Sequence, residues 1–345
     1  MATVWILLVA CCFASVCRGD IDVDTEAPPG PSRELNVTEL DHLVDTDEGR
    51  AELEAEFKSI KGGQRKPWTV GEANLDKNRH ADLLAYDETR VHLPYDEESD
   101  YINANYLDGF NREKEYVATQ GPLNSTTSDL WAMVWHLNIK KIVMLANLVE
   151  HNESKVFRYW PLVNGMYGDI TVVKVAEIPF PKFQHVLRIF LIKKGGVPRI
   201  VRHFHFTGWP DLGVPRDTNG IVSLLNQARY EYAPRDKAPI LIHCSAGIGR
   251  TGTVILFDSM KEMAKGDYGR VNFPERLDHM RLLRPDLVEK KEQYVFAHRA
   301  VRDALTSKET EAYLLKVSKA YQHAEKLVFE GAVLAASDAA FESTR

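Results

Sequence analysis

The stretch ILIHCSAGIGRTGT at residues 240–253 decides the fold of this chain. An apolar run ends at His243 and a helical pattern begins at Thr251, so the sequence predicts a strand, a loop and a helix in succession. The loop consists of Cys244, Ser245, Ala246, Gly247, Ile248 and Gly249. Its glycines allow the backbone N–H groups to turn inward, and the helix presents its N-terminus to the same point. We expect this cysteine loop to bind a tetrahedral dianion.

Cys244 opens the cysteine loop and Arg250 directly follows it. Inward N–H dipoles and a guanidinium group both favour thiolate over thiol, which makes Cys244 a candidate nucleophile. Arg250 can bind two phosphate oxygens with its planar fork, a contact that lysine cannot make. A lone cysteine is more often a buried apolar side chain, and a bare Cys-x5-Arg pattern also occurs by chance. The interpretation therefore depends on the whole stretch.

Residues 243–253, HCSAGIGRTGT, closely resemble the signature loop of the classical, cysteine-dependent protein tyrosine phosphatases. The resemblance implies hydrolysis of phosphotyrosine on proteins through a phosphocysteine intermediate on Cys244. It also implies that the Thr251 hydroxyl assists breakdown of this intermediate and that His243 tunes the thiol. Neither a metal nor an organic cofactor is needed, because Arg250 and the backbone neutralise the phosphate.

A general acid is required, because a tyrosine phenolate leaves slowly unless it receives a proton. Residues 207–215, TGWPDLGVP, provide a candidate on a mobile lid, with Trp209 as part of its hinge. Asp211 would protonate the leaving group and later act as the base for water. A Trp-Pro-Asp turn by itself is more often structural, but this one precedes Cys244 as the acid loop of the family does.

The resemblance extends from about Phe57 to Leu305, most of the chain. It implies one α/β domain, with a central twisted mixed β-sheet flanked by helices and the cysteine loop at a strand-to-helix turn. Residues 202–207 and 301–305 look most like receptor-type members that have one catalytic domain.

Four further residues match positions that the family uses around its site. Asp82 corresponds to the residue that holds the substrate backbone. Glu150 and Lys155 fit the loop whose glutamate pairs with the signature arginine. Gln293 fits the glutamine that positions the hydrolytic water.

Two residues depart from the family pattern. His80 replaces the tyrosine that walls the deep phosphotyrosine pocket, and we expect weaker selectivity and lower affinity unless the wall tolerates the change. Glu289 replaces a glutamine that organises the second step, and its carboxylate should slow hydrolysis of the intermediate. Both departures also suit a domain that binds phosphotyrosine proteins without turning them over quickly. The apolar Ala246 and Ile248 argue against a phosphoinositide phosphatase.

Composition and periodicity agree with a globular protein. The chain has 345 residues and a net charge of −6, and its histidines and cysteines lack metal-ligand spacing, so neither nucleic acid nor a metal is an expected partner. Phosphotyrosine-containing proteins are the expected partners. Helical patterns cover residues 128–137, 218–230, 251–265 and 289–305, and strand patterns cover residues 141–145, 170–175 and 185–192.

The ends of the chain differ from its middle. Residues 1–19 are expected to be a signal peptide or a short anchor, because residues 4–17 are almost entirely apolar. This predicts secretion or membrane association, with a cytosolic location if the segment is not a working signal. Residues 20–48 are acidic and proline-containing and are predicted to be a disordered linker. The phosphatase domain is expected at residues 49–305, and a helical tail at residues 306–345.

Overall fold

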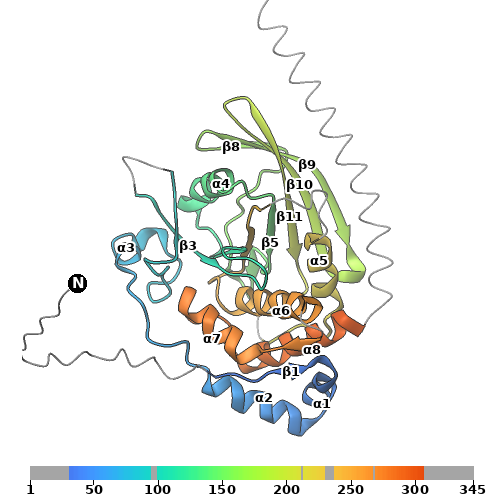
Figure 1. Ribbon diagram of the computed structural model, residues 1–345. Helices are drawn as coiled ribbons and strands as arrows, with labels where there is room; N and C mark the ends of the chain where they lie inside the picture. The colour runs from blue at the N-terminus through green and yellow to red at the C-terminus, as the bar shows by residue number, and fades with distance from the viewer. Residues whose placement is uncertain (1–30, 95–98, 211–212, 230–236, 267–268, 307–345) are drawn as a thin grey trace, which may run out of the picture.

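The computed structural model describes residues 31–94, 99–210, 213–229, 237–266 and 269–306. Its framework is a nine-stranded mixed sheet with the order β2-β3-β4-β12-β5-β11-β10-β9-β8 (Figure 1). The strands of this sheet are β2 (Arg90–His92), β3 (Tyr101–Leu107), β4 (Tyr116–Thr119), β5 (Lys141–Met144), β8 (Asn164–Tyr167), β9 (Ile170–Phe180), β10 (His185–Lys194), β11 (Val197–Phe206) and β12 (Ile240–His243). Two small pairs lie outside it: β1 (Leu35–Asn36) with β13 (Arg270–Val271), and β6 (Val149–Glu150) with β7 (Glu153–Ser154).

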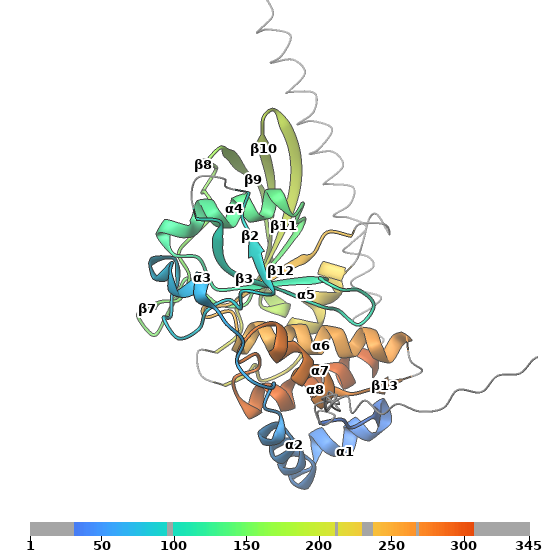
Figure 2. The same cartoon turned by 60° about the vertical axis from the view of Figure 1, so that its left-hand side comes forward.

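Helices cover both faces of this sheet, with α6, α7 and α8 on one side and α4 on the other (Figure 2). The α-helices are α1 (Leu40–Asp45), α2 (Asp47–Ser59), α3 (Thr69–Glu72), α4 (Thr127–His136), α5 (Asn219–Arg229), α6 (Gly249–Gly266), α7 (Phe273–Leu283) and α8 (Lys291–Thr306). Short 3-10 turns cover Val37–Glu39, Leu75–Lys77, Asn124–Thr126 and Pro181–Phe183. The predicted fold class, a mixed central sheet flanked by helices, is confirmed.

The centre of the sheet positions the cysteine loop. β12 runs parallel to β4 on one side and to β5 on the other, and all four of its residues are buried. A parallel strand that is covered on both faces is apolar throughout, which is the pattern of residues 240–242. β12 and α6 lie where the sequence predicted a strand and a helix, and residues 244–248 connect them.

The other periodic segments also formed the predicted elements. The four helical patterns correspond to α4, α5, α6 and α8, and the three strand patterns correspond to β5, β9 and β10. The structure adds α7, which no pattern indicated. Phe273, Leu277 and Met280 are its buried hydrophobic residues, and the helix begins with the Asn272 side chain accepting a hydrogen bond from the N–H of Glu275.

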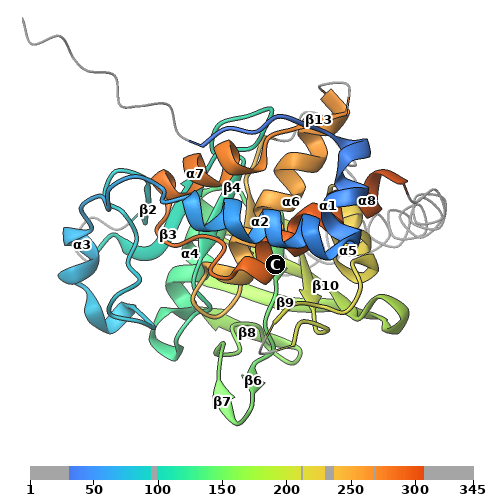
Figure 3. The ribbon, with the colours of Figure 1, turned by 90° about the horizontal axis from the view of Figure 1, so that it is seen from below.

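The prediction of a disordered linker at residues 20–48 was wrong for its described part, from residue 31 onward. β1, α1 and the start of α2 lie there, and α1 and α2 pack against α8 (Figure 3). Leu40, Leu43 and Val44 are buried at helical spacing, a pattern hidden by the acidic composition of the whole segment. The domain boundary predicted at residue 49 is wrong for the same reason.

The acidic residues of this segment are paired with arginines of the domain. The Arg302 guanidinium of α8 donates to Asp41 at 3.0 Å and to Asp45 at 2.7 Å. The hydrogen bond from Arg302 lowers the pKa of the Asp45 carboxyl. Both carboxylates remain more than half exposed, so these ion pairs join the segment to α8 at the surface, beside its buried apolar side chains.

Some predictions fall on residues that lie outside the described ranges. These are the signal peptide or anchor of residues 1–19 and the helical tail beyond Thr306. Among the described helices, none is long and apolar enough to span a bilayer.

Replacing Leu40 by alanine should test whether the N-terminal helices belong to the folding unit. Leu40 is fully buried, so Leu40→Ala should lower the free energy of unfolding by about 2–5 kcal/mol in urea titrations. Leu75 is 52% exposed, and Leu75→Ala is the matched control, with an expected change within about 0.5 kcal/mol. Equally small effects in the two variants would show that α1 does not unfold together with the sheet.

Candidate active site

The connection between β12 and α6 brings a backbone donor onto the sulfur of Cys244. Gly247 has a φ of +75°, and a Cβ at this position would lie 2.2 Å from the carbonyl oxygen of Thr119. Only glycine combines this conformation with so close an approach. The N–H of Gly247 lies 3.3 Å from Cys244 Sγ and donates to it.

A buried guanidinium holds the back of the cysteine loop. Arg284 is 1% exposed, and it donates to the carbonyl oxygens of Gly247 at 2.9 Å and Ala246 at 3.3 Å. It also donates to the side-chain oxygens of Asn103 and Asn105 on β3. Because no carboxylate is among these partners, burial lowers the pKa of Arg284 to about 10. Sequence reasoning missed Arg284, since it belongs to no periodic pattern.

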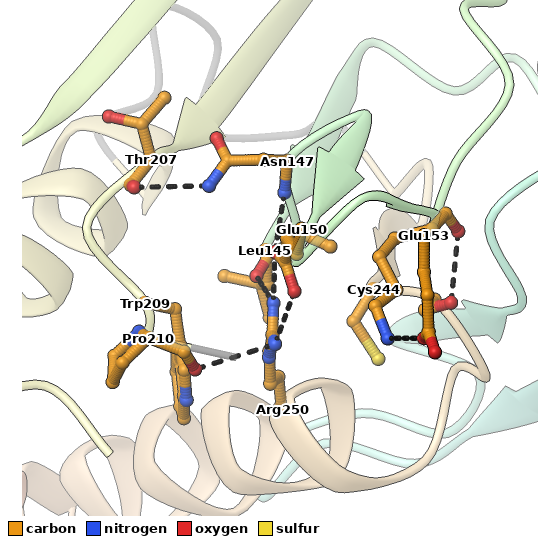
Figure 4. Close-up of polar contacts among 12 residues, drawn as sticks. Leu145, Asn147, Glu150, Glu153, Thr207, Trp209, Pro210, Cys244 and Arg250 are labelled. Atoms are coloured by element: carbon orange, nitrogen blue, oxygen red, sulfur yellow. Dashed lines mark hydrogen bonds and ion pairs between the residues drawn. The ribbon is translucent and has the colours of Figure 1, made fainter. Parts of the chain in front are cut away.

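The predicted pairing of Glu150 with Arg250 is present (Figure 4). The guanidinium donates to both carboxylate oxygens, at 2.7 and 2.8 Å. The N–H of Asn147 fixes the same carboxylate at 2.8 Å, and Arg250 also donates to the carbonyl oxygens of Leu145 and Pro210. This bidentate pair orients the fork of Arg250 at the start of α6.

Cys244 and Arg250 line a cleft of about 810 Å³. The other predicted site residues along the same cleft are His80, Asp82, Lys155, Ser245, Ala246, Ile248, Gly249, Glu289 and Gln293. The fold therefore brings segments from residue 80 to residue 293 to one place. Within the described ranges, no group of three or more His, Cys, Asp or Glu side chains could hold a metal ion.

Trp209 and Thr251, also predicted as site residues, are buried. The indole N–H of Trp209 donates to the carbonyl oxygen of Gly213 at 3.1 Å. This hydrogen bond links residues 207–210 to residues 213–215, the two described parts of the segment. The Thr251 hydroxyl has no hydrogen-bond partner among the described residues. Asp211, the predicted general acid, lies outside the described residues.

Glu289 and Gln293 lie beside the N-terminus of α6. A Cβ built on Gly249 would be 2.9 Å from Glu289 Oε2 and 2.9 Å from Gln293 Nε2. The side-chain oxygen of Gln293 accepts from the N–H groups of Glu289 and Lys290, at 2.9 and 3.2 Å. The carboxylate of Glu289 thus occupies a region where the helix dipole favours negative charge.

The opposite wall of the cleft is anchored by Arg79. Its guanidinium donates to the carbonyl oxygens of Gly121 at 3.1 Å and Pro122 at 2.9 Å. His80 and Asp82 follow on the surface and are both exposed. Arg79 holds the backbone of this wall while the two predicted substrate-binding side chains stay accessible.

A third wall comes from the β6–β7 hairpin. The ammonium group of Lys155 pairs with Glu153 at 2.7 Å. The hydroxyl of Ser245 donates to the carbonyl oxygen of Lys155 at 2.9 Å, and the N–H of Gly121 donates to the carbonyl oxygen of Ser245 at 2.7 Å. The Ser245 hydroxyl therefore joins the hairpin segment to the cysteine loop, and Gly121 holds the backbone of the same loop.

The family model of the protein-tyrosine phosphatases matches residues 74–303. The chain belongs to the protein-tyrosine phosphatase family. It is 43% identical over 253 residues to the human receptor-type tyrosine-protein phosphatase zeta. This match covers 69% of this chain and 11% of that protein. It is 39% identical over 281 residues to the Lar-like tyrosine-protein phosphatase of Caenorhabditis elegans, covering 79% of this chain and 12% of the relative.

A third relative is receptor-type tyrosine-protein phosphatase F of Danio rerio, which is 37% identical over 317 residues. The match covers 88% of this chain and 16% of that protein. The chain therefore spans less than a fifth of the length of these receptor-type relatives. The family match includes every predicted site residue, with His80 and Glu289 among them.

Five histidines are buried among the described residues of this phosphatase domain. Burial lowers the pKa of His185 and His243 to about 4, that of His205 and His298 to about 3, and that of His203 well below its usual value. In the unfolded chain the same groups titrate near 6.5. The unfolded state therefore binds protons that the folded state does not, and the free energy of unfolding should fall as the pH decreases from about 6.5 toward 4.

A single substitution should reduce by one the number of protons that the chain takes up when it unfolds in acid. The Nδ1–H of His298 donates to the carbonyl oxygen of Tyr294 at 2.9 Å, and asparagine can keep this donor without titrating. His298→Asn should reduce the slope of unfolding free energy against pH by about 1.4 kcal/mol per pH unit between pH 4 and 5.5, in urea titrations. The exposed His42→Asn is the control, and an unchanged slope in His298→Asn would contradict the expectation.

Proposed function

We propose that this domain hydrolyses phosphotyrosine on proteins in two displacement steps. In the first step the thiolate of Cys244 attacks phosphorus, the bond from phosphorus to the tyrosine oxygen breaks, and Asp211 gives that oxygen its proton. In the second step water attacks the phosphocysteine, Asp211 takes a proton from the water, and the thiolate leaves. The products are the dephosphorylated tyrosine and inorganic phosphate.

The geometry around Cys244 carries this proposal. The N–H of Gly247 already lies 3.3 Å from the sulfur, and α6 begins at Gly249, the last residue of the cysteine loop. Both features favour an anionic sulfur and an anionic substrate. In the proposed mechanism the remaining loop N–H groups and the guanidinium of Arg250 bind the phosphoryl oxygens, and Arg250 exchanges its contact with the carbonyl oxygen of Pro210 for the phosphate. Charge spreads over these oxygens during transfer.

The other predicted residues take supporting roles in this proposal. Glu150 orients Arg250, and its bidentate contact supports this role. The Thr251 hydroxyl, buried and without a partner among the described residues, is available to assist the departure of the thiolate. Gln293 has its oxygen engaged by two backbone N–H groups, so its amino group is left to orient water. Asp82 holds the substrate backbone.

Substitution of the two principal residues tests the mechanism in the full chain. Cys244→Ser should lower kcat on a phosphotyrosine peptide by about 10⁴-fold or more. Asp211→Ala should lower it by about 10²–10⁴-fold, because the leaving phenolate then lacks a proton. In Asp211→Ala the loss of kcat should be smaller on an aryl phosphate whose phenol is more acidic than tyrosine, such as p-nitrophenyl phosphate. Equal losses on both substrates would contradict the role of Asp211 as the acid.

Glu289 favours a second candidate function, the binding of phosphotyrosine proteins with slow turnover. Its carboxylate lies against the N-terminus of α6, where the substrate dianion would also bind, so the two negative charges repel each other. If the wild-type chain hydrolyses the peptide no faster than Cys244→Ser, yet still binds it, the domain is a recognition module and not an enzyme.

The two departures from the family pattern can be measured in one assay. In rapid-quench experiments the wild type should release a burst of phenol before a slow steady state, and Glu289→Gln should raise the steady-state rate about three- to tenfold. His80→Tyr should lower KM for the peptide, because a larger ring walls the pocket. Absence of a burst would exclude slow dephosphorylation as the limiting step, and unchanged KM in His80→Tyr would show that the wall tolerates histidine.

A further inference from the structure

A continuous series of hydrogen bonds leads from β10 to the carbonyl group of Cys244. The guanidinium of Arg188 lies 3.5 Å from His203 Nδ1, and His203 Nε2 lies 2.7 Å from the hydroxyl of Tyr159. The same hydroxyl lies 2.8 Å from His243 Nε2, and His243 Nδ1 lies 3.1 Å from the carbonyl oxygen of Cys244. The series has a cation at one end and the proposed nucleophile at the other.

The register of the sheet explains why these side chains meet. Arg188 of β10 is directly opposite His203 of β11, so both point to the same face. Met144 of β5 is the partner of His205 on one side and of His243 on the other, which brings β11 and β12 side chains to this face as well. Tyr159 enters from the segment before β8 and crosses over β5, where its hydroxyl reaches both histidines.

The two ends of the series fix every proton in it. A guanidinium can only donate, so His203 accepts at Nδ1 and carries its proton at Nε2. A carbonyl oxygen can only accept, so His243 carries its proton at Nδ1 and accepts at Nε2. The Tyr159 hydroxyl then accepts from His203 and donates to His243. Reversing this direction would set two donors against each other at Arg188 and two acceptors against each other at Cys244.

Burial excludes a charged alternative. His203, His243 and Tyr159 are 0% exposed, and burial lowers the pKa of both histidines and raises that of the phenol. All three groups are therefore neutral near pH 7, and each contact of the series contains one proton. Since a neutral imidazole carries a single proton, the tautomer at one end determines the tautomer at the other.

Arg188 is itself held firmly. Its Nε donates to Glu177 at 2.7 Å, and the guanidinium carbon lies 4.7 Å from the ring centre of Trp160. The same NH1 group lies 3.2 Å from His205 Nδ1, and the opposite nitrogen of that ring lies 2.9 Å from the carbonyl oxygen of Ala146. One terminal nitrogen thus donates one proton to each of the two histidines. This double donation requires a planar group in a fixed position.

We propose that Arg188 is a positioning residue for the cysteine loop. Its donation to His203 sets the direction of the whole series, so that His243 donates to the carbonyl oxygen of Cys244. With that oxygen engaged by His243, its partial negative charge is compensated, and the sulfur is left to the N–H of Gly247. The inference deepens the proposed function, because it assigns to a residue on a distant strand the control of thiolate formation at Cys244.

The tautomers can be read directly from the wild-type full chain. Long-range ¹H–¹⁵N correlation spectra at pH 7 should show His203 and His205 protonated at Nε2 and His243 protonated at Nδ1. This measurement needs no substrate and no activity, so failure of the proposed phosphatase mechanism would not affect it. A proton on Nδ1 of His203, or on Nε2 of His243, would overturn the inference.

A double-mutant cycle tests the effect on Cys244. The rate of alkylation by iodoacetamide is followed against pH by mass spectrometry of the peptide that carries Cys244, because the full chain has three more cysteines. Arg188→Met should shift the midpoint upward by about 0.5–1 pH unit. Tyr159→Phe should do the same, and the double variant should match Tyr159→Phe within about 0.2 unit, since the series is already interrupted.

Arg199→Met is the matched control. Arg199 also lies on the sheet beside an indole, with its guanidinium carbon 3.7 Å from the ring centre of Trp135, and it donates to a carbonyl oxygen of α4. The described charged groups around the cysteine loop are unchanged in all of these variants; they are Arg79, Asp82, Glu150, Glu153, Lys155, Arg250, Arg284, Glu289 and Lys290. An unshifted midpoint in Arg188→Met, or additive shifts in the double variant, would overturn the inference.

Discussion

Arg284 is the group on which the geometry of the cysteine loop depends. A cup of inward N–H groups requires that the carbonyl oxygens of the same turn point elsewhere, and buried carbonyl groups need donors. Arg284 supplies these donors from behind, while two asparagines of β3 hold the guanidinium in place. A cation with only neutral partners also contributes positive potential beneath the sulfur without an adjacent carboxylate to cancel it.

The two glutamates beside the cleft differ in how their negative charges are compensated. Glu150 pairs with Arg250 through two hydrogen bonds, so its charge is compensated where it lies. Glu289 lies against the N-terminus of α6, which in the proposed mechanism also binds the phosphate. In that mechanism the first carboxylate orients a cation toward the anion and the second repels the anion, so the two have opposite effects on the same cleft.

The sequence predicted the elements whose signals are local. Residues 240–253 form a strand, a turn and a helix because an apolar run and a helical period are properties of neighbouring residues. The pairing of Glu150 with Arg250 followed from resemblance. Arg284, Arg188 and α1 escaped prediction because each depends on partners far away in the chain, such as β3, β11 and α8. An average over residues 20–48 also concealed four buried side chains, Leu35, Leu40, Leu43 and Val44, among many acidic ones. Asp211 remains a prediction.

The topology of the sheet has a consequence for the order of assembly. β9, β10 and β11 are joined by short turns, so their pairing closes small loops, whereas β12 must meet β4 and β5 across more distant segments of the chain. Contacts between distant segments form slowly, because the loop entropy is lost before the contacts compensate for it. The pairing of β12 is therefore expected late in folding, and the N–H of Gly247 reaches Cys244 Sγ only after it. Until β12 has paired, the Cys244 thiol is exposed to oxidants, whereas in the folded chain it is buried.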